Sequence, residues 1–272
     1  MADVVSTKHR KEISSSQIEV VELLFKYRFC SVELLRSSLS LQTKAGLYRK
    51  LAILIDKGYV GKRYDKSYRI LGKPAVYYLL PKGLSELRKL PKHESIDDNL
   101  IKYAYNDKRI TSEQFIKHSL NIYKTSLQLT RLYPVLKFFT KREIKGLSYL
   151  PKNLPDAFVS LKLDNQTEPS RFFLDLIPDS MFGRELNKKV AAYIDFFEGD
   201  SWQAVAGNSL PRLLLLCENG TTEKRVQRQL ARQMYDEELE CYTSTFLSLA
   251  NANASEYAIW SDVLDPDDLI FL

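Results

Sequence analysis

The sequence predicts a two-domain protein of mixed class, an α+β domain followed by an α/β domain. Helical periodicity and then two strand-like runs mark the first part of the chain, whereas helices and strands alternate after residue 99. The charge is also divided, because residues 1–150 hold 29 Lys and Arg against 14 Asp and Glu, a net +15, and residues 151–272 hold 11 against 20, a net −9. We place the boundary in the polar stretch 91–98, which gives domains of residues 1–92 and 99–272.

Three helices open the first domain. Ile18, Val21, Leu24 and Phe25 form an apolar stripe in a helix over 13–29, behind serines that can cap it. A second helix begins behind a serine at position 31, and a third begins after a turn at 40–43. The third helix carries leucines at helical spacing, at positions 47, 51 and 54, and we expect Gly58 to end it.

Two strand-like runs follow the third helix. The first begins at residues 59–60, the second covers 75–79, and a basic loop over 64–71 joins them. A helix followed by a basic hairpin is the order of a winged helix-turn-helix. In such a domain the recognition helix reads base edges in the major groove, and a cationic hairpin lies along phosphates.

Candidate DNA contacts follow from this interpretation. Arg and Gln side chains can read purine edges, and Lys and Arg supply affinity for phosphates without sequence information. The predicted recognition-helix residues are Gln42, Thr43, Arg49 and Lys50, and the predicted wing residues are Lys62, Arg63, Lys66 and Arg69. The positive first half favours double-stranded DNA as its partner, although surface cations in many proteins are only solvated.

The second domain reads as a continuous series of helices and strands. A helix over 112–133 ends before Pro134, and the following elements are strands near 135–144, 154–163 and 171–177, a helix over 183–197, a strand over 212–217, a helix over 222–239 and a strand over 241–247. The helix over 222–239 aligns Arg225, Arg228 and Arg232 on one face, as a second phosphate-binding stripe or a solvated face. The acidic tail after residue 262 either docks on its own domain or binds a partner.

The motifs Leu154-Pro155-Asp156-Ala157 and Phe172-Phe173-Leu174-Asp175, with the helical run 188–193, resemble the PD-(D/E)XK nuclease-like fold, a restriction-endonuclease-like αβββαβ core. With the winged helix before it, the chain from about residue 13 to 247 resembles the replication-relaxation family of bacterial plasmids and conjugative elements. The resemblance implies a role in replication or mobilisation of such an element.

The resemblance also implies a site. Asp156 and Asp175 would share a divalent metal ion, Mg²⁺ or Mn²⁺, that activates water, and no other cofactor is implied. The fold usually carries a lysine two residues after the second acid, but here that residue is Ile177, which can neither donate a hydrogen bond nor supply charge. Lys188 or Lys189 could substitute from the following helix. Asp175 could instead be a buried carboxylate paired with Arg171 or Arg184.

We therefore expect a duplex DNA-binding protein with a degenerate nuclease-like domain. One alternative is a metal-dependent nickase or endonuclease that uses Asp156 and Asp175, and another is a transcription regulator whose second domain binds protein, which would favour a homodimer. Partner proteins of a replication or conjugation complex are also expected. No apolar run approaches the ~18–20 residues of a membrane span, so we expect the bacterial cytoplasm. Three isolated cysteines indicate buried thiols rather than disulfides.

Overall fold

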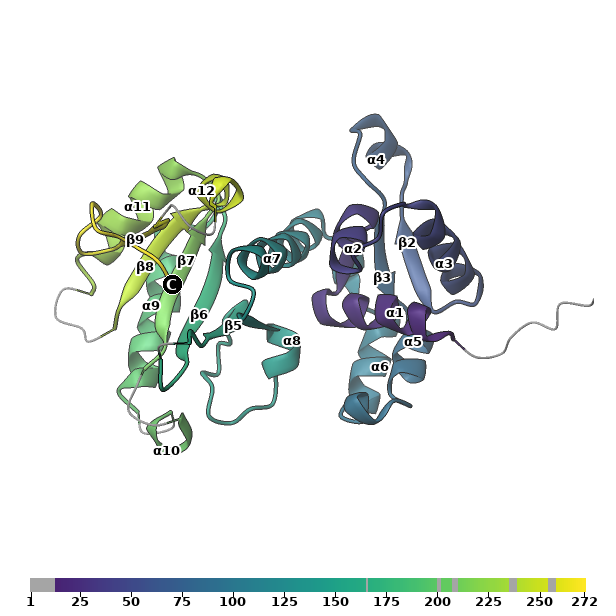
Figure 1. Ribbon diagram of the computed structural model, residues 1–272, viewed down its shortest axis with the longest axis horizontal. Helices are drawn as coiled ribbons and strands as arrows, with labels where there is room; N and C mark the ends of the chain where they lie inside the picture. The colour runs from purple at the N-terminus through teal and green to yellow at the C-terminus, as the bar shows by residue number, and fades with distance from the viewer. Residues whose placement is uncertain (1–12, 165, 200–201, 207–209, 235–238, 254–257) are drawn as a thin grey trace, which may run out of the picture. The chain divides into compact units, whose positions relative to one another are not determined.

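The computed structural model describes residues 13–272 except 165, 200–201, 207–209, 235–238 and 254–257 (Figure 1). The chain divides into two compact units, one ending at Leu120 and one beginning at Asn121. The polar stretch 91–98, where we expected the boundary, lies inside the first unit, where it forms η1 (Pro91–His93) and leads into α6 (Asp98–Tyr105). None of the described helices is long and apolar enough to cross a membrane.

The first unit combines short helices with a small antiparallel sheet. Its strands are β1 (Phe29–Ser31), β2 (Val60–Arg63) and β3 (Val76–Leu79), in the order β1-β3-β2. Its helices are α1 (Ser15–Tyr27), α2 (Val32–Ser38), α3 (Ala45–Asp56), α4 (Lys66–Ile70), α5 (Pro81–Leu87) and α6, and η2 (Lys108–Thr111) leads to the start of α7. Leucines of α1, α2 and α3 are fully buried in its core, which explains the helical spacing of the apolar residues.

The predicted end of α3 is confirmed at Gly58. This residue has φ +72°, in the left-handed region, and its N–H donates to the Ile55 carbonyl at 2.9 Å. The N–H of Tyr59 donates to the Leu54 carbonyl at 2.9 Å, which completes a Schellman motif. The chain therefore reverses sharply into β2, where Tyr59 and Val60 are buried.

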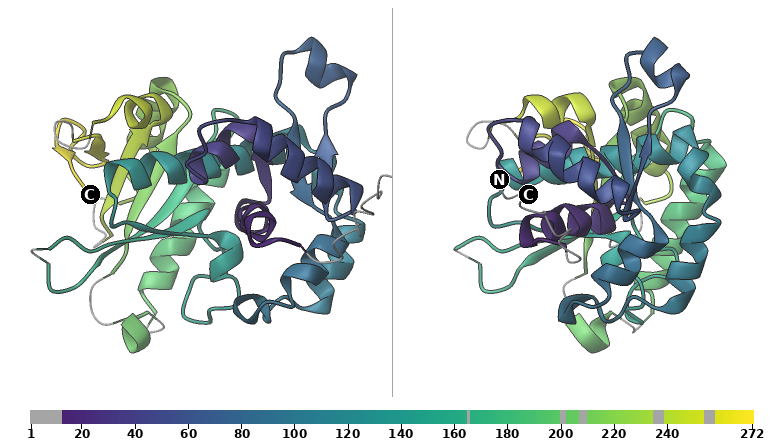
Figure 2. Two further views of the ribbon diagram at one scale, coloured as in Figure 1. Left: turned by 45° about the vertical axis from the view of Figure 1, so that its right-hand side comes forward. Right: turned by 90° about the vertical axis from the view of Figure 1, so that its right-hand side faces the viewer.

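The predicted loop over 64–71 was wrong, because this segment contains the helix α4. The Asp65 side chain caps the helix by accepting the Tyr68 N–H at 3.1 Å, and the Tyr68 ring is 2% exposed. A basic loop without an apolar stripe gives little helical signal, and one buried tyrosine with one cap decides the structure here. The β2–α4–β3 segment projects beyond the other helices of the unit (Figures 1 and 2).

The second unit is built on a seven-stranded mixed sheet with the order β10-β9-β8-β7-β6-β5-β4. Strands β4 (Lys137–Thr140), β5 (Ala157–Leu161) and β6 (Ser170–Ile177) pair antiparallel, and β6, β7 (Arg212–Cys217) and β8 (Cys241–Thr245) pair parallel. Strands β9 (Trp260–Asp262) and β10 (Leu269–Ile270) complete the antiparallel edge, so the acidic tail docks on its own unit.

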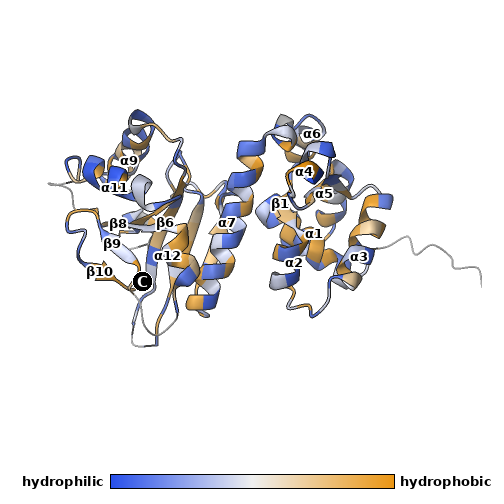
Figure 3. Ribbon diagram, turned by 90° about the horizontal axis from the view of Figure 1, so that it is seen from above, coloured by the Kyte–Doolittle hydropathy of each residue, from blue (hydrophilic) through white to orange (hydrophobic). Residues whose placement is uncertain are grey.

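Helices cover both faces of this sheet (Figures 1 and 3). One face packs against α9 (Gly183–Phe197) and α11 (Gly220–Leu230), with α10 (Gln203–Ala206) nearby in the chain. The part of α7 (Glu113–Leu132) after Leu120 and α12 (Phe246–Asn251) lie on the other face, where the Arg131 guanidinium donates to the Ala252 carbonyl at 3.3 Å. Trp202 and Trp260 are 1% and 0% exposed in this unit.

The predicted order of helices and strands in the second domain is present, with additions. The strand expected near 135–144 is shorter, because α8 (Lys141–Ile144) begins directly after β4. Thr140 and Glu143 form a capping box, in which the Thr140 N–H donates to Glu143 Oε2 at 2.8 Å, and this favours a helical turn over a longer strand. The helix expected over 222–239 is also shorter and ends at Leu230 as α11.

Candidate functional site

The predicted DNA-contacting residues of the first unit lie before and on α3 and on the β2–α4–β3 segment. Gln42 and Thr43 are exposed in the turn before α3, Arg49 is exposed on α3 itself, and Lys50 is half-buried. Lys62 on β2 and Lys66 and Arg69 on α4 are exposed as well. Seven of the eight predicted DNA-contacting residues therefore reach solvent from two adjacent parts of one unit.

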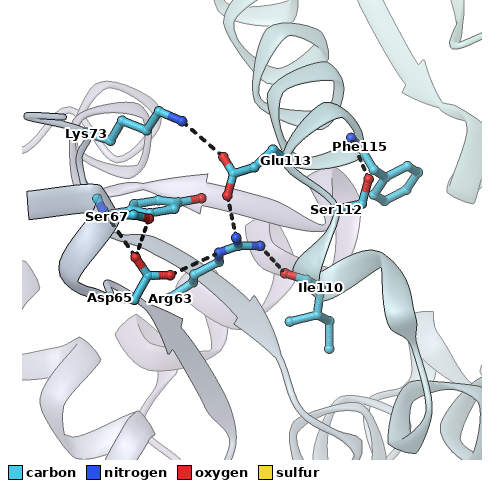
Figure 4. A network of polar contacts seen from close by, with 9 residues as sticks. Arg63, Asp65, Ser67, Lys73, Ile110, Ser112, Glu113 and Phe115 are labelled. Atoms are coloured by element: carbon cyan, nitrogen blue, oxygen red, sulfur yellow. Dashed lines mark hydrogen bonds and ion pairs between the residues drawn. The ribbon is translucent and has the colours of Figure 1, made fainter. Parts of the chain in front are cut away.

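Arg63 has a different environment from the other predicted wing residues (Figure 4). Its side chain is 18% exposed, its Nη1 donates to the Ile110 carbonyl at 2.9 Å, and its Nη2 pairs with the Glu113 carboxylate. Lys73 Nζ lies 3.2 Å from the other oxygen of Glu113. Arg63 thus ties β2 to the start of α7. Its contact with phosphate stays a prediction, and we leave Arg63 out of the proposed wing contacts.

Aromatic contacts order two of the remaining cations of this segment, Lys62 and Arg69. The Tyr64 ring lies 5.2 Å from Lys62 Nζ and 5.9 Å from Arg69 Cζ, measured to the ring centroid. Cations over an aromatic face gain about 0.5–1 kcal/mol at exposed sites. The charges of Lys62 and Arg69 are therefore held near one another at the surface, although repulsion between them favours separation.

In the second unit, the two predicted carboxylates are brought together across β5 and β6. The Asp156 N–H donates to Asp175 Oδ1 at 3.0 Å, and the Leu176 N–H donates to Asp156 Oδ2 at 3.0 Å. Asp175 is 1% exposed, and Asp156 is half-buried. Asp156, directly before β5, and Asp175 on β6 thus each accept a backbone hydrogen bond from the segment of the other, which fixes the relative position of the pair.

Helix α9 supplies two more members of this cluster. Lys189 Nζ lies 2.9 Å from Asp175 Oδ1, and the Tyr193 hydroxyl donates to Asp175 Oδ2 at 2.7 Å. Burial lowers the pKa of Lys189, but the charges of Asp175 and Asp156 outweigh it and raise that pKa above its ordinary value. Burial and the same two carboxylates raise the pKa of Tyr193 well above its usual range, so its hydroxyl stays protonated.

The structure distinguishes between the candidates for the cation of this site. Lys189, rather than Arg171 or Arg184, compensates Asp175, and Lys188 lies outside the cluster, in a groove between α9 and α11. Ile177 is 1% exposed in the apolar core, as its side chain requires. Tyr193 belongs to the helical run 188–193 but was not among the predicted site residues, although its spacing of four residues from Lys189 places the two side chains on one helical face.

Two carboxylates are chemically suitable ligands for a divalent ion. Here, however, oxygens of both are engaged by other groups of the protein. Carboxylates with water and substrate phosphate are the usual ligands of Mg²⁺. Both oxygens of Asp175 are already engaged, one by Lys189 and the Asp156 N–H, the other by Tyr193. No group of three His, Cys, Asp or Glu residues that could hold a metal ion occurs among the described residues. In this arrangement Lys189 supplies the compensating positive charge.

Comparison with known proteins identifies the family. The replication-relaxation family model matches residues 21–211 of the chain. The chain belongs to the replication-relaxation family. This match includes α3, the β2–α4–β3 segment and all four members of the Asp156–Asp175 cluster, and it ends before β7 and α11. The predicted family membership is confirmed.

Two solved structures also align with this replication-relaxation protein. They are described as the structure of restriction endonuclease FokI and the structure of restriction endonuclease FokI bound to DNA. Each alignment covers 86% of this chain with a TM-score of 0.34, at 11% and 12% sequence identity. The chain spans about two fifths of the FokI chains, 42% and 43% of their lengths. No curated protein matches the sequence.

Proposed function

We propose that this replication-relaxation protein binds duplex DNA through a winged helix formed by α1, α2, α3 and the β1-β3-β2 sheet. Helix α3 would lie in the major groove, and the β2–α4–β3 segment would follow the phosphates as the wing. The observation that carries the proposal is that both of these parts present exposed cations, Arg49 on α3 and Lys62, Lys66 and Arg69 on the wing. Phosphate contacts supply affinity, and side chains on α3 would read bases.

The family suggests the setting of this binding. Membership in the replication-relaxation family supports a role in replication or mobilisation of a plasmid or conjugative element, in the bacterial cytoplasm. The second unit would then serve that process mainly as a scaffold, because the charge of its aspartate pair is already compensated by Lys189.

The wing can be tested through the salt dependence of DNA binding. The full-length variant with Lys62→Ala, Lys66→Ala and Arg69→Ala should bind every duplex more weakly, and its log–log salt slope should fall by about 2 to 3, near 0.9 for each lost phosphate contact. Fluorescence anisotropy titrations of labelled duplexes at several salt concentrations measure this slope. The matched control replaces Lys89, Lys92 and Lys102, which are exposed lysines of the same unit outside the winged-helix surface. Equal losses in both variants would show that net charge, not the wing, determines binding.

A second candidate function is metal-dependent DNA cleavage. The observation that favours it is the position of Lys189. Its ammonium group contacts Asp175, so a lysine lies beside the aspartate pair although Ile177 occupies the usual lysine position. Asp156 and Asp175 would hold the ion, which lowers the pKa of a bound water and stabilises charge on the phosphate. Lys189 would leave its ion pair and orient the attacking water.

Cleavage is tested by incubating supercoiled plasmid with the purified protein and Mg²⁺ or Mn²⁺, beside the variants Asp175→Asn and Lys189→Met. Nicking by the native protein that both variants lose, while circular dichroism shows that they are folded under the assay conditions, would assign the second unit as a nuclease. Salt-sensitive binding without nicking would leave it as a scaffold. Lys162→Met is the control, because Lys162 is an exposed lysine of the same unit that lies outside the aspartate cluster and outside the pocket lined by α9 and α11.

A further inference from the structure

A cationic groove lies between α9 and α11 in the second unit. Arg184 and Lys188 of α9 line one side, and Arg228 of α11 and Arg232 after it line the other. The groove encloses about 680 Å³, and its remaining lining includes the amides of Asn187, Gln229 and Gln233. Figure 3 shows α11 as one of the most hydrophilic helices of the unit. No Asp or Glu is among the lining residues.

The charge of the groove contrasts with its surroundings. Residues 151–272 carry a net charge of −9, yet four cations gather here. Two of them on each side are spaced four residues apart, and like charges at this spacing repel by about 0.2–0.5 kcal/mol per pair. Within the described part of the chain, none of the four forms an ion pair with a carboxylate. An anion in the groove would relieve this repulsion.

Hydrogen bonds fix the distance between the two sides of the groove. Gln229 Nε2 donates to the Gly183 carbonyl at 2.5 Å and to Asn187 Oδ1 at 2.6 Å, and Gln233 Nε2 donates to the Asn187 carbonyl at 3.4 Å. A Cβ at Gly183 would lie 2.9 Å from Gln229 Oε1, so glycine permits this close approach. The cations are therefore mounted on two helices that are already held together, and a ligand need not order the backbone.

We propose that the α9–α11 groove is a second DNA-binding site, which contacts the phosphodiester backbone. This proposal rests on the proposed function, which supplies DNA as the ligand. Arg184, Arg228 and Arg232 each present a planar guanidinium that can bind phosphate oxygens in a bidentate manner, and Lys188 adds a point charge. Two cationic rows with amides between them suit a continuous chain of phosphates. The protein then contacts DNA through both units, although the second unit is acidic in total.

The test is DNA binding by the full-length variant with Arg184→Gln, Lys188→Gln, Arg228→Gln and Arg232→Gln. We expect its log–log salt slope to fall by about 3 to 4 relative to the native protein, since four phosphate contacts are lost. The control carries the four changes Lys137→Gln, Lys145→Gln, Lys152→Gln and Lys162→Gln, which remove the same charge from exposed positions elsewhere in the second unit. An unchanged slope, or an equal change in the control, would overturn the proposal.

Combining the variants distinguishes failure of the groove proposal from failure of the winged-helix proposal. If both proposals hold, the wing and groove variants each lower the slope and the combined variant lowers it further. A groove variant that lowers the slope while the wing variant does not would contradict the winged helix alone, and the reverse result would contradict the groove alone. Single-stranded and duplex DNA are titrated in parallel to identify which form the groove binds. Circular dichroism of each variant checks that the fold is intact.

Discussion

Neighbouring side chains with the same charge have different roles in this protein. Lys62 and Arg63 are adjacent on β2, but Lys62 is exposed, whereas Arg63 donates to the Ile110 carbonyl and pairs with Glu113. Strand alternation points consecutive side chains to opposite faces, which explains the difference. The sequence shows both cations but does not show that Glu113, 50 residues away, pairs with Arg63.

This difference gives a prediction about stability and binding. Arg63→Ala should lower the free energy of unfolding of the first unit by about 2 kcal/mol, because charge-assisted hydrogen bonds of a half-buried arginine are lost. Lys62→Ala should leave that free energy within about 0.5 kcal/mol and weaken DNA binding. Urea unfolding followed by circular dichroism, with anisotropy titrations beside it, measures both quantities. Equal stability of the two variants would contradict the role given to Arg63.

Lys189 shows how much of the Asp156–Asp175 cluster the sequence can predict. The buried residues of α9 are Leu186, Val190, Tyr193 and Phe197, and this apolar stripe places position 189 beside the stripe and 188 away from it. Helical phase thus favours Lys189 over Lys188. The partner of Asp175 could not be chosen from the sequence, because nothing in it positions β6 relative to α9.

Replacement of Lys189 should destabilise the second unit. In Lys189→Met the carboxylate of Asp175 stays buried and loses its cation, and we expect a loss of about 3 kcal/mol in the free energy of unfolding. Lys188→Met should change it by less than about 0.5 kcal/mol. Urea unfolding at neutral pH compares the two. A Lys189→Met protein as stable as the native one would show that Tyr193 and the Asp156 N–H alone suffice for Asp175.

The ion pair between Lys189 and Asp175 predicts that the free energy of unfolding depends on pH. The pKa of Lys189 is raised in the folded protein, so its stabilising contribution is complete below the unfolded value of about 10.4 and is lost as the pH rises through the folded value. The stability difference between native protein and Lys189→Met should therefore be constant from neutral pH to about pH 10 and decrease above it. Urea unfolding of both proteins over this range measures the difference. A difference that already decreases between about pH 7 and 9 would contradict a raised pKa.

At the scale of elements, prediction succeeded where periodicity and burial coincide. Helix α9 and strand β7 have the bounds expected from the sequence, because each has a clear apolar pattern and buries it. Helices α4 and α6 were missed, since α4 depends on one buried tyrosine and α6 buries no residue completely. Strand β1 was missed because three residues carry little periodicity, and its pairing with β3 is a long-range contact.

The turn from α3 into β2 gives a prediction at this scale. Gly58→Ala should lower the stability of the first unit by about 1–2 kcal/mol, because alanine at φ +72° is strained. The control is Gly46→Ala, within α3, where an added Cβ meets no atom within 4 Å and should not destabilise the helix. Thermal unfolding of both variants provides the comparison. Destabilisation of similar size in both would show that the left-handed conformation is not the cause.

At the scale of the whole molecule, charge separates the two halves more clearly than hydrophobicity does. The first 150 residues carry +15 and the remainder −9, so the first half should supply most of the attraction for a polyanion such as the proposed DNA. This division could be read from composition. The cationic groove of α9 and α11 could not, because its two pairs, Arg184 with Lys188 and Arg228 with Arg232, are distant in sequence and meet only when the two helices pack on the same sheet face.

The two tryptophans make the second unit optically distinct. Both residues of this type in the chain, Trp202 and Trp260, are buried there, whereas the first unit has none. Tryptophan emission therefore reports the unfolding of the second unit alone, and far-ultraviolet circular dichroism reports both units. Spectra of a single sample can thus show which unit a substitution destabilises, without separating the protein into fragments.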